Sequence, residues 1–232
     1  MAGPTVVFDL DGTLIDTAPD LVTTLNTIFG HEGLPPIGYD AARKLIGGGA
    51  RRMIERGLAA EGRNPAVERI DALVRDFLDH YAAHMTDRSR PFPGVEPALD
   101  ELAQCGCRLA ICTNKFEWLS VRLLEAFGLR KRFAAICGPD TVGVSKPDPQ
   151  ILRATVARAG GRIANAVMVG DSGIDIATAR AASIPIVAVD FGYTETPVAD
   201  LGPDRLVSSY AELPEAVLDL IAGVRQEFAR IR

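Results

Sequence analysis

Short runs of apolar residues, each giving way to polar residues, recur along the chain and constrain its fold more than any other feature. They occupy residues 5–8, 109–112, 134–137, 166–169 and 186–189. Each run is apolar throughout instead of alternating, which is typical of a parallel strand buried on both faces. Helical patterns lie between the later runs, as at Leu119, Leu123 and Phe127, which share one helix face before Gly128. Alternating strands and helices predict a doubly wound α/β sheet from about residue 92 onward.

The segment from Asp16 to Arg90 has a different pattern, with no convincing strand and three helical stretches. Two of these stretches place apolar residues on one helix face, namely Leu21, Leu25, Ile28 and Phe29 in one and Val67, Ile70, Val74 and Tyr81 in the other. A stiff Pro-Phe-Pro-Gly segment follows at residues 91–94. We therefore expect an α/β core made of residues 1–15 and 92–232, interrupted by an all-helical cap of residues 16–91.

Charge and cysteine content limit the possible partners. The chain has 25 basic and 30 acidic residues, a formal net charge of -5. A duplex nucleic-acid binder needs a basic face, so we expect no nucleic-acid partner. No apolar run approaches the roughly 20 residues of a membrane helix, so we expect no membrane partner. The 4 cysteines lack the spacing of a zinc site, and we expect reduced, mostly buried thiols and a cytoplasmic location.

Polar residues follow four of the predicted strands. They are Asp9, Asp11, Gly12 and Thr13 after the first strand, Thr113 and Asn114 after the second, Lys146 in the loop beyond the third, and Asp171 and Asp175 after the fourth. In open parallel sheets, ligands bind beyond the carboxyl ends of the strands. We therefore expect several acids, a hydroxyl and a lysine to meet at one edge of the sheet.

This arrangement resembles the haloacid dehalogenase superfamily over nearly the whole chain. The four motifs of that superfamily appear in order: DxDGT at residues 9–13, a strand ending in Thr-Asn at 113–114, KPxP at 146–149, and GDSxxD with its acids at 171 and 175. The resemblance implies a Rossmann-like sheet with a mobile cap, Mg²⁺ as the cofactor, and a small anionic phosphate ester as the substrate.

The resemblance also implies a set of metal ligands. It assigns Mg²⁺ to Asp9, to Asp171 and to the backbone carbonyl of Asp11, with Asp175 in support from one helical turn beyond Asp171. Asp175 could instead only cap its helix. Mg²⁺ prefers hard oxygen ligands, and it can bridge a carboxylate to a phosphoryl oxygen, which offsets the repulsion between two anions.

The remaining motif residues are expected to bind the phosphate group. Lys146 would supply a compact positive charge to the transferring group and to Asp9. Thr113 and the backbone amides around Gly12 and Asn114 would hold the remaining phosphoryl oxygens.

The two acids of the first motif imply a covalent mechanism. Asp9 is expected to attack phosphorus and form an aspartyl-phosphate. Asp11 is expected to protonate the leaving alkoxide and later to activate water. An acid at the second position of the motif, here Asp11, favours an enzyme that acts on phosphate esters over the dehalogenases and phosphonate hydrolases of the superfamily. Thr13 matches the phosphatase form of the motif better than the DxDGV common in sugar phosphomutases.

The predicted cap contains a triple glycine, Gly47 to Gly49, before a helix that carries Arg51 and Arg52. Such a loop lets backbone amides and a helix N-terminus approach an anion closely, so Gly48, Gly49 and one of the two arginines, Arg51 in our prediction, are candidate substrate ligands. The loop resembles that of the bacterial phosphoglycolate phosphatases, which implies 2-phosphoglycolate as the substrate. A flexible hinge with two solvated arginines is the alternative.

Other functions are compatible with parts of the pattern. They are a phosphatase of another small ester or of pyrophosphate, a sugar phosphomutase, and a phospho-acceptor signalling domain. The last also combines an acidic cluster with Thr and Lys, but it is shorter and lacks the long insert between Asp9 and Thr113. His80 and His84 have a spacing that suits a metal, but with no further ligand nearby in sequence an exposed helix face is favoured. The sequence leaves the oligomeric state open.

Overall fold

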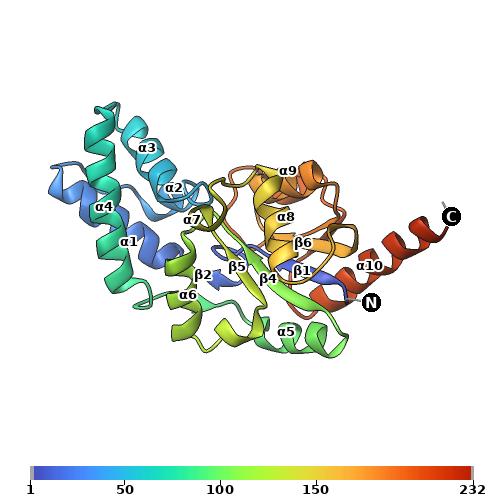
Figure 1. Ribbon diagram of the computed structural model, residues 1–232. Coiled ribbons are helices and arrows are strands. Elements are labelled where there is room, and N and C mark those ends of the chain that lie inside the picture. Colours follow the sequence, from blue (N-terminus) through green and yellow to red (C-terminus); the bar gives the residue numbers. More distant parts are fainter. Residues whose placement is uncertain (1–2, 231–232) are drawn as a thin grey trace.

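A parallel sheet forms the centre of the molecule, in the order β5-β4-β1-β6-β7-β8 (Figure 1). The computed structural model describes residues 3–230, with the backbone alone over residues 224–230; residues 1, 2, 231 and 232, which the sequence assigned to the core, lie outside the described residues. The strands of this sheet are β1 (Thr5–Phe8), β4 (Arg108–Cys112), β5 (Ala135–Cys137), β6 (Ala166–Gly170), β7 (Ile186–Val189) and β8 (Arg205–Val207). The five predicted strands are present, and the sequence pattern missed β8.

Helices cover both faces of this sheet. One face packs against α5 (Val95–Gln104), α6 (Glu117–Ala126) and α10 (Leu213–Arg230). The other face packs against α8 (Pro149–Arg158) and α9 (Gly173–Ala182). In Figure 1 the sheet lies between these two groups. The doubly wound α/β architecture predicted from the sequence is confirmed.

The central strand explains why the runs are apolar at every position. Val6 and Phe8 belong to the apolar cluster on one face of the sheet, and Val7 belongs to the cluster on the other. All three side chains are fully buried. Because successive side chains of a strand point to opposite faces, a strand covered on both sides needs an apolar residue at every position.

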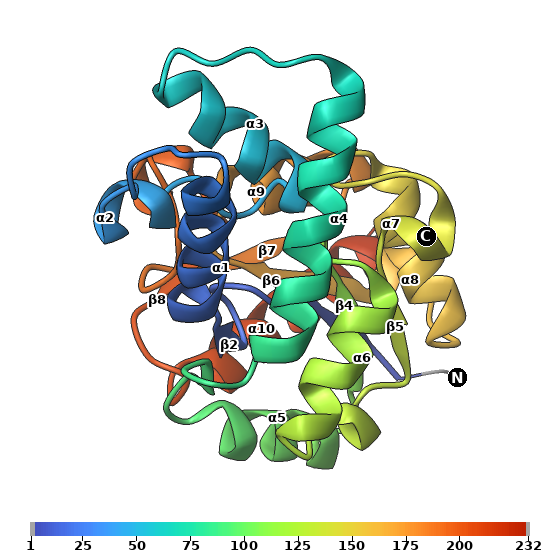
Figure 2. The ribbon, with the colours of Figure 1, turned by 90° about the vertical axis from the view of Figure 1, so that its left-hand side faces the viewer.

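Four helices lie beyond the carboxyl-end edge of the sheet, and Figure 2 views the molecule from their side. They are α1 (Ala18–His31), α2 (Tyr39–Arg43), α3 (Ala50–Ala60) and α4 (Val67–His84). The chain enters and leaves this layer through two antiparallel strands, β2 (Ile15–Asp16) and β3 (Arg90–Pro91). The expectation of no strand between Asp16 and Arg90 is therefore wrong at both ends, because strands of two residues leave no periodic pattern. The short α2 was also not expected.

The buried face of helix α4 overlaps the expected one only in part, at Tyr81 and the partly buried Val74. Leu73, Phe77 and Tyr81 are buried at i, i+4 and i+8, whereas Val67 is 62% exposed. The remaining short elements are α7 (Pro139–Val142) and the 3-10 helices Arg130–Arg132, Ile163–Asn165 and Val198–Leu201. No helix in the described part of the chain is both long and apolar enough to cross a membrane.

Candidate active site

Three buried acids meet where the central strands end. Asp9 follows β1, Asp171 follows β6, and Asp175 lies in the first turn of α9. One carboxylate oxygen of each lies within 4.8 Å of those of the other two, and all three side chains are buried. The parallel strands β1 and β6 pair in register from Thr5 with Ala166, which brings the first two acids to the same edge. The sequence prediction of a shared edge is correct for these residues.

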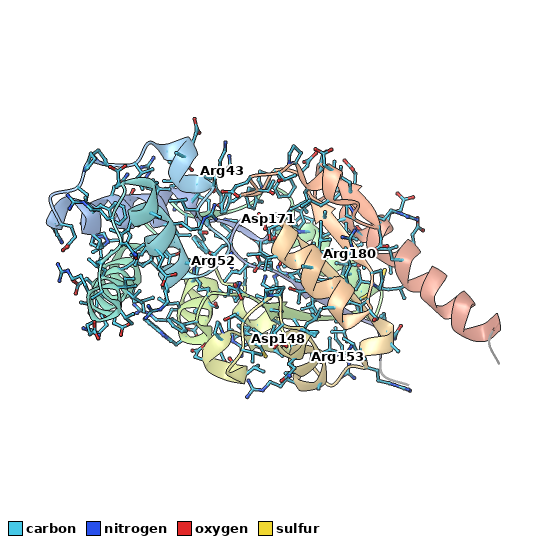
Figure 3. The ribbon with its side chains drawn as sticks, turned by 90° about the horizontal axis from the view of Figure 1, so that it is seen from above. Arg43, Arg52, Asp148, Arg153, Asp171 and Arg180 are labelled. Atoms are coloured by element: carbon cyan, nitrogen blue, oxygen red, sulfur yellow. The ribbon has the colours of Figure 1, made fainter. Side chains whose placement is uncertain are left out.

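Asp171 is held by contacts from distant parts of the chain. The Thr13 hydroxyl donates to its Oδ1 at 2.8 Å, and the backbone N–H of Tyr193 donates to its Oδ2 at 2.7 Å. Two glycines give it room, since a Cβ at Gly12 or at Gly192 would lie 2.5 or 2.3 Å from its Oδ2. Gly12 also has a φ of 86°, in the region that favours glycine. Figure 3 shows Asp171 at the end of the sheet that faces the layer of helices α1 to α4, which are called the cap helices below.

Lys146 connects two acids of the cluster. Its Nζ lies 2.9 Å from Asp9 Oδ1 and donates to Asp175 Oδ1 at 2.6 Å. The other oxygen of Asp175 accepts from the backbone N–H and the hydroxyl of Ser172. Burial disfavours the ammonium of Lys146, but the charges of Asp175 and Asp9 outweigh it and raise the pKa of Lys146. Asp175 therefore completes the capping box of α9 with Ser172 and also positions Lys146.

The acids repel one another as well as attracting Lys146. Burial, aided by the charges of Asp175 and Asp9, raises the pKa of Asp171 to about 8. Burial also raises the pKa of Asp9 to about 6, although Lys146 opposes the shift. A cluster of carboxylate oxygens with an excess of negative charge is the donor set that a hard divalent cation prefers. The residues present therefore fit the Mg²⁺ site that the motifs imply.

Asp11 has a buried partner that the sequence interpretation missed. Lys115 Nζ donates to Asp11 Oδ1 and Oδ2 at 2.7 and 2.9 Å, and the Thr17 hydroxyl donates to Oδ1 at 2.7 Å. Burial disfavours the ammonium of Lys115, but the charge of Asp11 and its hydrogen bond to Lys115 outweigh burial and raise the pKa of Lys115. The only signal in the sequence was its position directly after Thr113 and Asn114.

The second motif lies beside these acids, and one expected phosphate contact is not available. Thr113 Oγ1 accepts a hydrogen bond from the backbone N–H of Lys115 at 3.1 Å, which leaves the hydroxyl proton of Thr113 for a ligand. Asn114 donates to the carbonyls of Gly47 and Lys146 and accepts from the Lys146 N–H, so its side chain joins three loops. The expectation for Gly12 is wrong, because its N–H already donates to the Ile15 carbonyl at 3.0 Å.

A cavity of about 330 Å³ separates this cluster from the cap helices. Asp9, Asp11, Thr113, Asn114 and Lys115 line it on the sheet side, and Gly48, Gly49, Arg51 and Tyr81 line it on the cap side. Arg51 also pairs with Asp71 and Glu55 at the surface. Of the two arginines at the start of α3, Arg51 lines this cavity and Arg52 does not.

The cap helices also touch the loop that follows β7. Arg43 of α2 donates to the carbonyls of Phe191 and Gly192 at 3.0 and 2.9 Å, and Arg56 of α3 pairs with Glu195. Figure 3 labels Arg43 on the cap side and Asp171 at the sheet edge. Because Tyr193 of this loop holds Asp171, one loop contacts both the acid cluster and the cap.

The two histidines of α4 have local partners. His80 lies 3.0 Å from the Thr24 hydroxyl, and His84 lies 2.9 Å from Asp87. His84 is exposed, as expected, whereas His80 is half-buried against α1. Neither belongs to the one group of potential metal ligands found among the described residues.

Comparisons with known proteins find similar sequences over most of the chain. The family model described as haloacid dehalogenase-like hydrolase matches residues 6–189. A phosphoglycolate phosphatase of Caulobacter vibrioides is 47% identical over 95% of this chain and 93% of its own length. One of Mesorhizobium japonicum is 48% identical over 92% of this chain and 94% of its own length.

Solved structures show the same fold. A predicted phosphoglycolate phosphatase of Haemophilus somnus superposes with a TM-score of 0.84 at 27% identity, over 92% of this chain and 97% of its own. CbbY of Rhodobacter sphaeroides, solved in complex with phosphate, superposes with a TM-score of 0.78 at 28% identity, over 93% of this chain and 99% of its own. From the match over most of its length, the chain belongs to the haloacid dehalogenase-like hydrolase family.

Proposed function

We propose that this protein is a Mg²⁺-dependent phosphomonoester hydrolase that works through an aspartyl-phosphate, with 2-phosphoglycolate as its substrate. The observation that carries the proposal is the contact between Asp9 and Lys146 beside Asp171, on the sheet side of a cavity that Asp11 also lines. The curated relatives named phosphoglycolate phosphatase support the choice of substrate. Residues 16–91 act in this proposal as a cap over the α/β core.

In the first step, a carboxylate oxygen of Asp9 forms a bond to phosphorus while the bond from phosphorus to the ester oxygen breaks. Asp11 in its acid form gives its proton to the departing alkoxide. Lys146 and the Thr113 hydroxyl stabilise the charge on the phosphoryl oxygens. Because Lys146 also holds Asp175, its ammonium is fixed in place before the substrate arrives.

In the second step, Asp11 takes a proton from a water molecule, whose oxygen attacks phosphorus and releases Asp9 and inorganic phosphate. Thr17 and Lys115 hold the Asp11 carboxylate in the wall of the cavity before the substrate binds. Glycolate and phosphate are the products, and Asp11 ends with its starting proton.

A divalent cation is part of the proposal. Asp9, Asp171 and the backbone carbonyl of Asp11 would hold Mg²⁺, and Asp175 would support them through Lys146 and Ser172. When bound, Mg²⁺ supplies the positive charge that lets a carboxylate approach a phosphate dianion.

Phosphate release from a panel of esters tests the proposed function. The panel contains 2-phosphoglycolate, several sugar phosphates, a nucleoside monophosphate and pyrophosphate, each with Mg²⁺ and with a chelator. We expect Mg²⁺-dependent release with a preference for 2-phosphoglycolate. Weak hydrolysis of many esters would be consistent with the proposed mechanism but would contradict 2-phosphoglycolate as the substrate. No phosphate release from any ester would contradict both proposals.

Metal binding should stabilise the fold in a pH-dependent way. The raised pKa values of Asp9 and Asp171 mean that, between about pH 4 and pH 8, the metal-free folded state binds more protons than the unfolded chain. The free energy of unfolding of the metal-free protein therefore falls as the pH rises through this window. Because Mg²⁺ binds the deprotonated carboxylates, it should raise the Tm more near pH 8 than near pH 5.

Differential scanning calorimetry with and without Mg²⁺ measures this effect. The Asp171→Asn variant is the control, since it lacks one of the proposed ligands and should lose most of the Mg²⁺-induced increase. If the Mg²⁺-induced increase in Tm is the same at both pH values, or is retained in Asp171→Asn, the cation binds at another site.

The cytoplasmic location expected from the thiol content remains a proposal. Three of the cysteines, Cys107, Cys112 and Cys137, are buried and Cys105 is exposed, all of them as thiols. Fractionation of cells that express the tagged protein would test the location.

A further inference from the structure

We propose that Tyr81 and Lys115 form a second anion subsite, which binds the carboxylate of the substrate while the phosphate faces Asp9. The proposal rests on the proposed function and adds to it the residues that select the substrate. The two side chains come from different parts of the molecule, Tyr81 from α4 of the cap and Lys115 from the loop after β4, and both line the cavity.

The hydroxyl of Tyr81 is the first observation. Tyr81 is 1% exposed, and its hydroxyl lies beside the Lys115 ammonium, which can only donate, so the hydroxyl proton has no acceptor within the described residues. Burying a hydroxyl without a partner costs free energy, so such groups are rare in folded proteins. Burial raises the pKa of Tyr81 to about 12, so the hydroxyl keeps its proton and is a donor at neutral pH. A ligand that accepts a hydrogen bond in this cavity would remove the cost.

Lys115 supplies the positive charge of the subsite. Its side chain is 5% exposed, and its Nζ lies 4.5 Å from the centre of the Tyr81 ring. Its two short contacts both go to Asp11, which must deliver a proton to the leaving group in the proposed reaction. When Asp11 turns to the leaving oxygen, Lys115 becomes a buried ammonium without a counter-charge. A substrate carboxylate would take the place of Asp11 beside it.

Apart from the Tyr81 hydroxyl, most side chains on the cap side of the cavity are apolar. Leu21, Met53, Val74, Phe77 and Leu78 give this side of the cavity an apolar wall. In such a wall a few polar groups determine orientation and specificity. Arg51, a cation that lines the cavity from the cap side, has a side chain that is 46% exposed, and it already pairs with Asp71 and Glu55. A solvated arginine in a surface ion pair discriminates less between substrates with and without a carboxylate than a buried ammonium and hydroxyl do.

The Tyr81→Phe variant tests the subsite, because it removes the hydroxyl and keeps the ring that packs on Phe77 and Lys115. The substrates are 2-phosphoglycolate and ethyl phosphate, which differ only by carboxylate against methyl. We expect the ratio of their kcat/KM values to fall by about tenfold or more, mainly through the KM for 2-phosphoglycolate. The Tm should not fall, because an unpaired hydroxyl has been removed.

The matched control is Tyr39→Phe, which makes the same change at an exposed tyrosine of α2 and should keep the ratio. Equal losses with both substrates would make Tyr81 a positioning residue for Asp11 and overturn the proposal. A ratio that survives Tyr81→Phe but is lost in Arg51→Ala would place the carboxylate at Arg51 and also overturn it.

Binding of glycolate separates this proposal from the proposed function. Glycolate has the carboxylate without the phosphate, and calorimetry with Mg²⁺ and inorganic phosphate measures its affinity without turnover. If the wild type fails to hydrolyse 2-phosphoglycolate, the proposed function fails, yet glycolate binding that weakens about tenfold in Tyr81→Phe still supports the subsite. Equal affinity in both proteins, or no binding to the wild type, overturns it.

Discussion

Replacing Asp9 by Asn should abolish phosphate release, with kcat reduced by at least about 10³-fold. The neutral amide oxygen is a poor nucleophile toward phosphorus, and the covalent intermediate does not form. The fold should survive, because Asn has the same shape and Lys146 keeps its contact with Asp175. Burial already raises the pKa of Asp9, so a neutral side chain at this position costs little stability. A rapid-quench assay for phosphate, with mass spectrometry of the trapped protein, measures both consequences.

The matched control is Asp148→Asn, which also exchanges an acid for an amide. Asp148 caps α8 by accepting from the backbone N–H of Gln150, and Figure 3 labels it away from Asp171. An Asn cap is as good as an Asp cap, so this variant should retain wild-type turnover. Phosphate release by Asp9→Asn within tenfold of the wild type, or phosphate trapped on that variant, would remove Asp9 as the nucleophile.

The strands and the acids at their ends were predictable because both follow from local patterns. A strand buried on two faces leaves an unbroken apolar run, and Val6, Val7 and Phe8 show the cause, with two side chains on one face and the third on the other. The acids after such runs must meet, since parallel strands end at the same edge. The proximity of Asp9 and Asp171 could therefore be predicted from the sequence alone.

Contacts between distant side chains were not predictable in this way. Lys115 pairs with Asp11 across 104 positions of the chain, and no pattern in either segment refers to the other. The same holds for Tyr193, whose backbone holds Asp171 from the loop after β7. Gly12 was mispredicted for a different reason. The sequence motif suggested a backbone N–H that is free to bind phosphate, but within the turn this N–H donates to the Ile15 carbonyl.

The cap was predictable as helical but not in its orientation. Helix α4 has apolar residues on more than one face, and periodicity alone grouped Val67 with Tyr81. Packing against α1 and α3 buries Tyr81 as expected, but it also buries Leu73 and Phe77 and leaves Val67 in solvent. Which face a helix buries depends on its neighbours, so Tyr81 could be assigned to the cavity only from the structure, whereas Gly48, Gly49 and Arg51 were predicted from the glycine-rich loop.

Replacing Lys146 by Met should reduce kcat by about 10²-fold or more and destabilise the protein. Met keeps the length of the side chain and removes its charge, which leaves Asp9 and Asp175 buried without their shared counter-ion. Removing one partner of a buried ion pair typically costs about 3–5 kcal/mol. The acids can relieve part of this cost by protonation, so the loss of Tm should grow as the pH rises from about 5 to 8. Lys131→Met, at an exposed lysine, is the control and should change neither property.

The Mg²⁺ dependence of this variant separates two roles for Lys146. The Lys146→Met site carries one more negative charge, so it should bind Mg²⁺ at least as tightly as the wild type, and more Mg²⁺ should not restore turnover. In Asp171→Asn a proposed ligand is lost instead, so a higher Mg²⁺ concentration should recover part of the activity. If Mg²⁺ rescues Lys146→Met, the lysine only sets the charge of the acid cluster. If it does not, the ammonium acts on the phosphoryl group itself, which is the role that its fixed position between Asp9 and Asp175 favours.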